Sequence, residues 1–191
     1  GTRGIGKTSL ARLFAKALNC HQYNSDIGDV CNNCPSCADI QNNSHLDLIE
    51  VDAASNSKVE EVRELMSGVK YSPSNGKYKI YLMDEVQNFS AKAWDALLKT
   101  LEEPPGHVVF LMATTESEKI PKTIISRCLQ FNLKVVSENV ISENLKRIFN
   151  KEEISFDDGS IELLAELARG SVRDSITLAD QAAYHSGNSL T

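Results

Sequence analysis

Hydrophobic residues recur along this chain in two patterns, and the change from one to the other divides it. Up to residue 134, short apolar runs alternate with segments of helical period, and the runs are predicted to be strands. The predicted strands are 46–51, 78–83, 108–113 and 129–133. Strands that alternate with helices predict an α/β fold, a parallel sheet with helices on both faces.

Helices are predicted before the first strand, over residues 8–18, and between later strands, over residues 57–69 and 91–101. Apolar residues surround most of the first helix, so we expect it to be buried on several sides. A capping box, Ser57-Lys-Val-Glu60, starts the second helix, and the prolines at 104 and 105 end the third.

Beyond residue 134 the pattern is helical throughout, most clearly at 161–168 and 171–184. A second, helical domain is the simplest explanation. We therefore expect two domains, residues 1–134 and residues 135–191.

Residues 20–37 follow neither pattern and hold four of the five cysteines of the chain. These four are Cys20, Cys31, Cys34 and Cys37. The odd total and the clustering favour metal binding over disulfides in an intracellular protein. Four thiolates suffice for a closed tetrahedral Zn²⁺ site, which would replace the missing core of this insertion. An iron–sulfur cluster, another metal and unligated thiols are the alternatives, although the Cys-Pro that completes a ferredoxin pattern is absent.

Charge and hydropathy exclude two classes of protein. The formal charge is −6 and the 20 Lys and Arg residues form no run, which argues against a surface that coats nucleic acid. Any DNA contact is expected from a few local groups. No stretch approaches the roughly 20 apolar residues of a membrane helix, and the start does not resemble a signal peptide, so we expect a cytoplasmic protein.

The first residues carry the strongest motif. Gly1-Thr-Arg-Gly4-Ile-Gly6-Lys7-Thr8 matches G-x-x-x-x-G-K-[ST] and opens directly into a predicted helix. In such a loop backbone N–H groups surround phosphate oxygens, the lysine reaches the outer phosphates and the hydroxyl of Thr8 holds Mg²⁺. A glycine-rich connection is the alternative. Because the strand that normally leads into this loop is missing, we expect the chain to be a fragment.

A second motif stands at the end of the predicted strand 78–83. Asp84 and Glu85 follow it directly, at the edge where ligands bind in open parallel sheets. We expect Asp84 to coordinate magnesium and Glu85 to orient or deprotonate the attacking water. An ordinary solvated strand end is the alternative.

Three further residues are weaker candidates. Thr115 ends a predicted strand, where its hydroxyl could read a terminal phosphate, and Arg127 precedes the last predicted strand. Both also fit ordinary surface positions. Arg173 lies in the first turn of a helix that Ser171 caps, where a cation opposes the helix dipole, so an anionic partner is expected. Asp174 or an ATP phosphate could be that partner.

Several stretches together resemble the gamma/tau subunits of the bacterial DNA polymerase III clamp loader. They are the phosphate-binding loop with Ser9, the four-cysteine insertion, Asp52-Ala-Ala-Ser, Leu97 to Pro105, Ala113-Thr-Thr and Ser126 to Phe131. One departure is Gln87, where the family often has histidine two residues after the glutamate.

The resemblance implies an AAA+ ATPase with a helical lid that uses ATP, Mg²⁺ and Zn²⁺. Nucleotide-binding residues would be Gly1, Gly4, Gly6, Lys7, Thr8, Ser9, Thr115 as first sensor and Arg173 as second. Arg127 would act on ATP held by a neighbour. The implied partners are other clamp-loader subunits in a hetero-oligomeric ring, a sliding clamp and primed DNA, with no membrane. A non-hydrolysing subunit of the same assembly and a branch-migration helicase are the competing interpretations.

Overall fold

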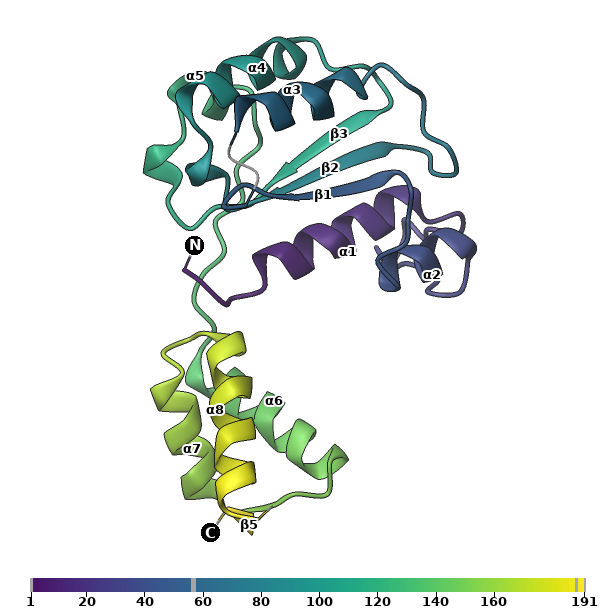
Figure 1. The fold of residues 1–191 in the computed structure, drawn as a ribbon. Coiled ribbons are helices and arrows are strands. Elements are labelled where there is room, and N and C mark those ends of the chain that lie inside the picture. The colour runs from purple at the N-terminus through teal and green to yellow at the C-terminus, as the bar shows by residue number, and fades with distance from the viewer. Residues whose placement is uncertain (1, 56–57, 188, 191) are drawn as a thin grey trace. The chain divides into compact units, whose positions relative to one another are not determined.

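The computed structural model describes residues 2–55, 58–187 and 189–190, and these fall into two compact units (Figure 1). One unit contains residues 8–130. The other contains the first seven residues together with 131–191. Among the described residues, every helix is too short or too polar to span a membrane.

A three-stranded parallel sheet organises the unit of residues 8–130. The strands β1 (Leu48–Asp52), β2 (Lys79–Asp84) and β3 (Val108–Met112) pair in the order β1-β2-β3. Four consecutive residues of the central strand, Ile80 to Met83, are at most 2% exposed. Both faces of β2 are therefore buried, which explains why its sequence is almost continuously apolar.

Helices cover both faces of this sheet. α3 (Val59–Ser67) and α4 (Ala91–Glu102) lie on one face, and α1 (Lys7–Asn19) lies on the other (Figure 1). The short segments are α2 (Pro35–Gln41), η1 (Val86–Asn88), η2 (Ser117–Lys119) and α5 (Lys122–Ile125). The predicted parallel sheet with helices on both faces is confirmed. The capping box predicted from Ser57 lies outside the described residues.

The register of the sheet aligns the carboxyl ends of its strands. Asp52 pairs with Asp84, and Met83 pairs with Met112. Since the strands are parallel, the residues that follow them meet at one edge of the sheet. This edge is where the site described below lies.

The prediction that α1 is buried on several sides is wrong. Only Ala15 and Asn19 of this helix are buried, whereas Leu10, Leu13 and Phe14 are 48%, 53% and 53% exposed. The helix meets the rest of its unit through one side only.

The predicted strand 129–133 is also absent. Leu129 and Phe131 are 88% and 80% exposed, and the segment forms no ladder with any described residue. An extended segment becomes a strand only when a neighbour supplies hydrogen-bond partners, and β3 pairs with β2 alone in the described sheet.

Three helices pack around a separate core in the other unit. They are α6 (Glu138–Lys151), α7 (Asp158–Leu167) and α8 (Val172–His185). The side chains of Asp157 and Ser171 cap α7 and α8 through backbone N–H groups. Two strands of two residues each, β4 (Ser155–Phe156) and β5 (Ser189–Leu190), form a short parallel pair that the sequence pattern did not predict.

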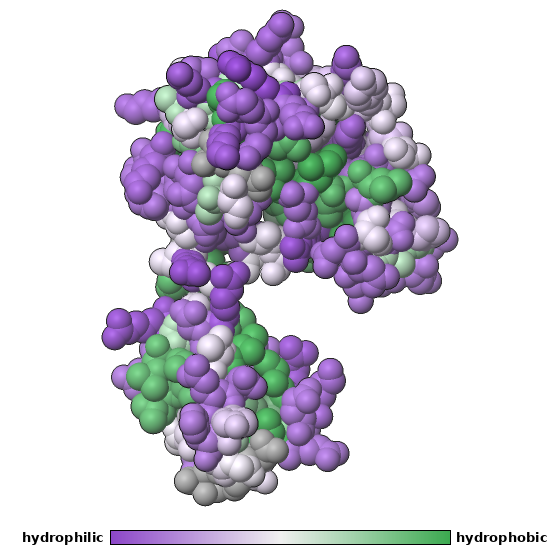
Figure 2. Space-filling model, viewed as in Figure 1, coloured by the Kyte–Doolittle hydropathy of each residue, from purple (hydrophilic) through white to green (hydrophobic). Residues whose placement is uncertain are grey.

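α7 carries apolar residues on its exposed side as well as its buried side. Apolar side chains gather at the surface over this helix, where Leu163 and Leu167 are each 55% exposed (Figure 2). Ile161 and Ala165, on the opposite side, are buried in the helical core.

Candidate nucleotide site and cysteine cluster

The phosphate-binding loop packs on the first turn of α8. The backbone oxygen of Gly4 accepts a hydrogen bond from Arg173 N at 3.1 Å. Gly4 has a φ of +76°, and a Cβ there would lie 2.1 Å from Ser171 Oγ, so only glycine fits. Lys7 Nζ donates to Thr2 O at 2.7 Å. The structure thus joins two predicted nucleotide-binding elements, the loop and the Arg173 segment, within one unit.

The roles of Gly1 and Ser9 in the loop stay predictions. Gly1 lies outside the described residues, and Ser9 is exposed.

No ion pair joins Arg173 to Asp174 in the part of the chain that the structure describes. Asp174 is therefore not the anionic partner expected for Arg173.

Thr8 and Asp84 come together at the carboxyl edge of the sheet. Thr8 Oγ1 donates to Asp84 Oδ2 at 2.5 Å, across 76 residues of sequence. The other oxygen, Oδ1, accepts from Glu85 N at 2.9 Å. A hydroxyl and a carboxylate oxygen are hard ligands of the kind that Mg²⁺ prefers, so the pair fits the predicted magnesium site.

Glu85 stands in a strained backbone conformation beside this pair. Its φ and ψ are 50° and 42°, in the left-handed region that costs a non-glycine residue of order 1–3 kcal/mol. Backbone hydrogen bonds on both sides hold the turn: Val86 N donates to Ala113 O at 3.1 Å, and Ala113 N donates to Met83 O at 2.8 Å. Such strain persists where surrounding contacts impose it, which is typical of functional sites.

Gln87 joins Glu85 to Thr115. Its Nε2 donates to Glu85 Oε2 at 2.6 Å and to Thr115 Oγ1 at 3.0 Å. Thr115 Oγ1 in turn donates to Glu85 Oε2 at 3.2 Å. The sequence indicated Glu85 and Thr115 separately, but no role for Gln87. Only the turn of η1 brings it back over Glu85.

Arg127 is paired within its own unit. Its Nη2 contacts Glu102 Oε1 at 2.8 Å, and its Nη1 donates to Thr123 O at 2.5 Å. Both ionic partners are substantially exposed, at 36% and 49% of their side-chain area. Exposed ion pairs of this kind contribute little to stability, so Arg127 can change partner at small cost.

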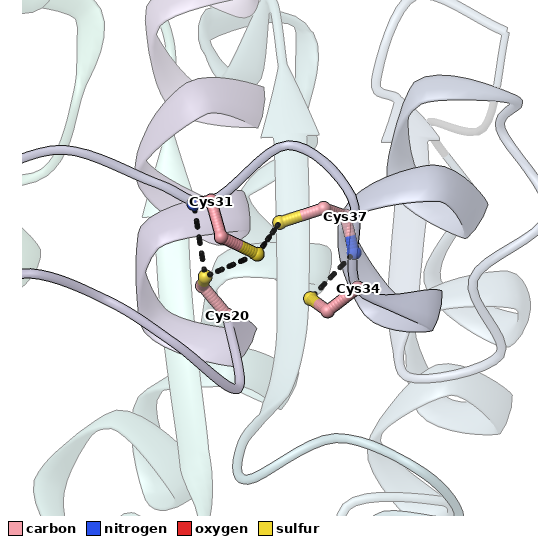
Figure 3. Close-up of side chains that lie close together, drawn as sticks. All are labelled: Cys20, Cys31, Cys34 and Cys37. Carbon is pink, nitrogen blue, oxygen red and sulfur yellow. Dashed lines mark hydrogen bonds between the residues drawn. The ribbon is translucent and has the colours of Figure 1, made fainter.

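The four predicted zinc ligands converge on one point (Figure 3). Their sulfur atoms all lie within 4.8 Å of one another. Cys20 Sγ is 3.5 Å from Cys31 Sγ, which is 3.9 Å from Cys37 Sγ. Tetrahedral Zn²⁺ with bonds of about 2.3 Å needs sulfur atoms about 3.8 Å apart, so the cluster fits this ion. Cys128 lies elsewhere and packs against the sheet core.

The four thiols differ in their tendency to ionise. Burial raises the pKa of Cys37 to about 12, and its hydrogen bond with Cys34 adds to this effect. At Cys20 and Cys34 burial also opposes the thiolate, but backbone N–H groups outweigh it and the pKa is lowered. A bound cation would supply the positive charge that lets all four act as thiolates.

Hydrogen bonds connect the cysteine cluster to the sheet. Ser36, between two of the cysteines, bonds His45 Nε2 at 2.9 Å, and His45 Nδ1 accepts from Asp47 N at 3.2 Å. Asn19, next to Cys20, accepts from Tyr78 N and donates to Tyr78 O. The sequence pattern gave no signal for these buried polar residues. For Asn19 the reason is that its partner Tyr78 lies 59 residues away in the chain.

Comparison with known families agrees with this geometry. A family model described as DNA polymerase III, delta subunit matches residues 1–137. A second, described as the ATPase lid domain of the DNA polymerase III clamp loader subunit, matches residues 140–188. The chain belongs to the DNA polymerase III clamp loader subunits. The resemblance inferred from the sequence motifs is confirmed.

Curated relatives point to the same family. The chain is 52% identical over 182 residues to DNA polymerase III subunit tau/gamma of Haemophilus influenzae, covering 95% of this chain and 26% of that protein. It is 47% identical over 190 residues to subunit tau of Bacillus subtilis, covering 100% of this chain and 33% of that protein. The chain therefore spans about a quarter to a third of the length of these relatives.

Solved structures share the fold. The RuvB Holliday junction branch migration motor of Thermotoga maritima matches with a TM-score of 0.66 at 16% identity, over 100% of this chain and 56% of that one. A DNA polymerase III gamma subunit-related protein of the same organism matches with a TM-score of 0.53 at 18% identity, over 74% and 47%. At these identities the likeness concerns the AAA+ fold alone.

Proposed function

We propose that this chain is the ATP-binding and ATP-hydrolysing part of a clamp-loader motor subunit. The contact between Thr8 Oγ1 and Asp84 Oδ2 carries the proposal, since it unites the end of the phosphate-binding loop with the acidic end of β2. Gly4, Gly6 and Lys7 bind the phosphates of ATP, and Arg173 contacts them from the lid. Ser9 assists at the start of α1, and Gly1, outside the described residues, completes the loop motif.

Thr8 and Asp84 would hold Mg²⁺, which would neutralise negative charge on the phosphates of ATP. Glu85 accepts a proton from water as the water oxygen attacks the γ-phosphorus. The bond between that phosphorus and the bridging oxygen breaks, and its electron pair leaves with ADP. Thr115 donates a hydrogen bond to the terminal phosphate, and Arg127 of one subunit neutralises charge on the ATP of a neighbour.

Zinc has a structural role in this proposal. Cys20, Cys31, Cys34 and Cys37 would hold it as four thiolates, a ligand set that is typical of structural zinc. The bound ion would replace an apolar core for residues 20–37. It takes no part in ATP hydrolysis.

The partners follow from the family. The subunit works in a hetero-oligomeric ring in the bacterial cytoplasm, where ATP binding opens a sliding clamp and places it on primed DNA. Its contacts with DNA are few and local, because the chain carries a net charge of −6. The polymerisation of nucleotides belongs to other subunits.

Turnover of ATP by the assembled complex tests the function. The subunit is combined with its clamp-loader partners, and hydrolysis is measured alone, with the sliding clamp, and with clamp and primed DNA. We expect the greatest stimulation with clamp and primed DNA together, and its loss in Lys7→Ala, which lacks the phosphate-binding lysine. ATP binding without turnover would instead support a non-hydrolysing subunit. Stimulation by a four-way junction in place of clamp and primer would support a branch-migration motor.

A further inference from the structure

Gln87 uses both polar groups of its carboxamide, in three hydrogen bonds, at the proposed catalytic edge. The Nε2 group donates to Glu85 Oε2 and to Thr115 Oγ1, as described above. The Oε1 atom accepts from Thr114 Oγ1 at 2.6 Å. A side chain that only filled space would not need this set of partners.

The orientation of the carboxamide is determined at both of its ends. Thr114 Oγ1 already accepts from Glu116 N at 2.9 Å, so its single proton is directed to Gln87 Oε1. At the other end Thr115 Oγ1 gives its one proton to Glu85 Oε2, so neither atom has a proton to offer the carboxamide. The amide NH₂ of Gln87 must therefore face Glu85.

The two hydrogen bonds on Glu85 Oε2 are not equivalent. Thr115 has one hydroxyl proton, which it donates to Glu85 in this structure. When that proton turns to a phosphate oxygen, Glu85 loses one of its two donors. Gln87 remains bonded to the carboxylate because its partners are all side chains of the protein.

We propose that Gln87 is a positioning residue that keeps Glu85 aligned while Thr115 exchanges the carboxylate for the terminal phosphate. This inference rests on the proposed ATPase function and deepens it, because it links phosphate sensing to the base through one side chain. Gln87 acts through Glu85 and does not touch the nucleotide. Its loss lowers the rate of hydrolysis and leaves ATP affinity unchanged.

The test compares variants in the assembled complex, with kcat for ATP and the Kd of Mg-ATP measured separately. Gln87→Met keeps the side-chain length and loses all three hydrogen bonds. We expect kcat to fall by about ten- to a hundredfold, the scale of effect of misplacing a reacting group, with Kd unchanged. The kcat of Gln87→His should lie between those of wild type and Gln87→Met, because an imidazole N–H can still donate to Glu85. Asn88→Ala, an exposed neighbour in η1, is the matched control and should behave as wild type.

Epistasis with the base separates positioning from a general structural role. In a Glu85→Gln background, adding Gln87→Met should leave the residual kcat unchanged, since the group that Gln87 positions is already disabled. If Gln87→Met lowers that residual rate by the same factor as in wild type, or leaves kcat of the wild-type background intact, the positioning role is wrong. If Gln87→Met fails to assemble, Gln87→Glu is used instead, because it loses the amide N–H donor and adds a negative charge. A wild-type complex that binds ATP without hydrolysing it overturns both this inference and the proposed function.

Discussion

At the scale of single residues, two carboxylates serve different purposes in this chain. Asp47 is 2% exposed and its carboxylate accepts hydrogen bonds from Ser74 N, Asn75 N and Gly76 N at 2.7, 2.7 and 2.6 Å. It fixes the turn before β2 and so supports the sheet. The carboxylate of Glu85 accepts instead from two side chains, those of Gln87 and Thr115, and lies at the edge where the substrate would bind.

Glu85→Gln should retain binding of ATP and lose most of its hydrolysis. The amide is isosteric but cannot accept a proton, and removing a general base lowers rates by about 10²- to 10⁴-fold. Binding of a fluorescent ATP analogue and steady-state turnover in the assembled complex provide the two measurements. Glu60→Gln, which changes an exposed carboxylate on α3, serves as the control. Normal turnover in Glu85→Gln would require a different base.

Asp47→Asn should destabilise the fold in a pH-dependent manner. Burial works against the Asp47 carboxylate, but the three backbone N–H groups outweigh it and lower its pKa. A pKa below the unfolded value of about 3.9 stabilises the folded state above that pH, and the stabilisation is lost as the pH falls through the folded pKa. At pH 7 the variant should lose on the order of 2–3 kcal/mol, the scale of a hydrogen-bonded buried charge.

Chemical unfolding of both proteins between pH 7 and pH 3 measures this difference. The gap in unfolding free energy should narrow as the pH falls below about 4, where Asp47 of the unfolded chain becomes protonated, and close as the pH falls through the lowered pKa of folded Asp47. The exposed Asp26→Asn variant should show no such gap. A gap of constant size would mean that Asp47 stabilises the turn through shape and not through charge.

At the scale of elements, the cysteine-containing segment, residues 20–37, connects α1 to the sheet without a sizeable apolar core of its own. Its buried hydrophobic cluster consists of Val30, Cys34 and Cys37, with Cys20 and Cys31 packed against them. So small a cluster cannot offset the loss of chain entropy of an irregular loop, and a bound ion is expected to supply the difference.

Protein purified without chelators should contain about one zinc per chain, as expected of a four-thiolate site. Cys37→Ser should lose the metal and become sensitive to proteolysis within residues 20–37, because an alcohol is a poor zinc ligand. Cys128→Ser should keep both the zinc and the resistance to proteolysis, since that thiol lies outside the cluster. Elemental analysis and limited proteolysis give the two measurements. Wild-type protein that contains no zinc would contradict the proposal.

At the scale of the whole molecule, the proposed reaction needs a second subunit. Arg127 pairs with Glu102 through an exposed contact, and the motif around it resembles a family element that acts on a neighbour. An arginine supplied by a neighbour contributes on the order of 10³- to 10⁵-fold to related phosphoryl transfers. ATP hydrolysis should therefore require assembly.

Arg127→Ala should leave ATP binding by the single subunit unchanged and abolish most turnover in the assembled ring. Glu102→Gln removes the same ion pair but keeps the arginine, so it should retain turnover and shows whether the ion pair itself matters. Lys7→Ala subunits, which bind ATP poorly, should restore activity when mixed with Arg127→Ala subunits by contributing their arginine. If the mixed rings assemble but stay as inactive as either variant alone, Arg127 does not act in trans.

The sequence by itself determined the features that depend on local pattern. Short apolar runs predicted β1, β2 and β3, and the spacing of four cysteines predicted a cluster whose sulfur atoms do converge. Motifs with a fixed spacing also indicated Thr8 and Asp84, because the chemistry of phosphate and magnesium binding requires those residue types. Such features can be recognised in the sequence because each motif consists of residues that are close together in the chain.

Only the tertiary structure decided what depends on a partner distant in the chain. Segment 129–133 has the composition of a strand but remains unpaired in the described sheet. Leu10, Leu13 and Phe14 of α1 are about half exposed because one side of the helix alone meets its unit. Gln87 gained a role only when η1 turned it towards Glu85 and β3 brought Thr115 beside both. A hydrogen bond needs both a donor and an acceptor, and a side chain is buried only when other residues cover it. For these residues the partner is brought close by the fold.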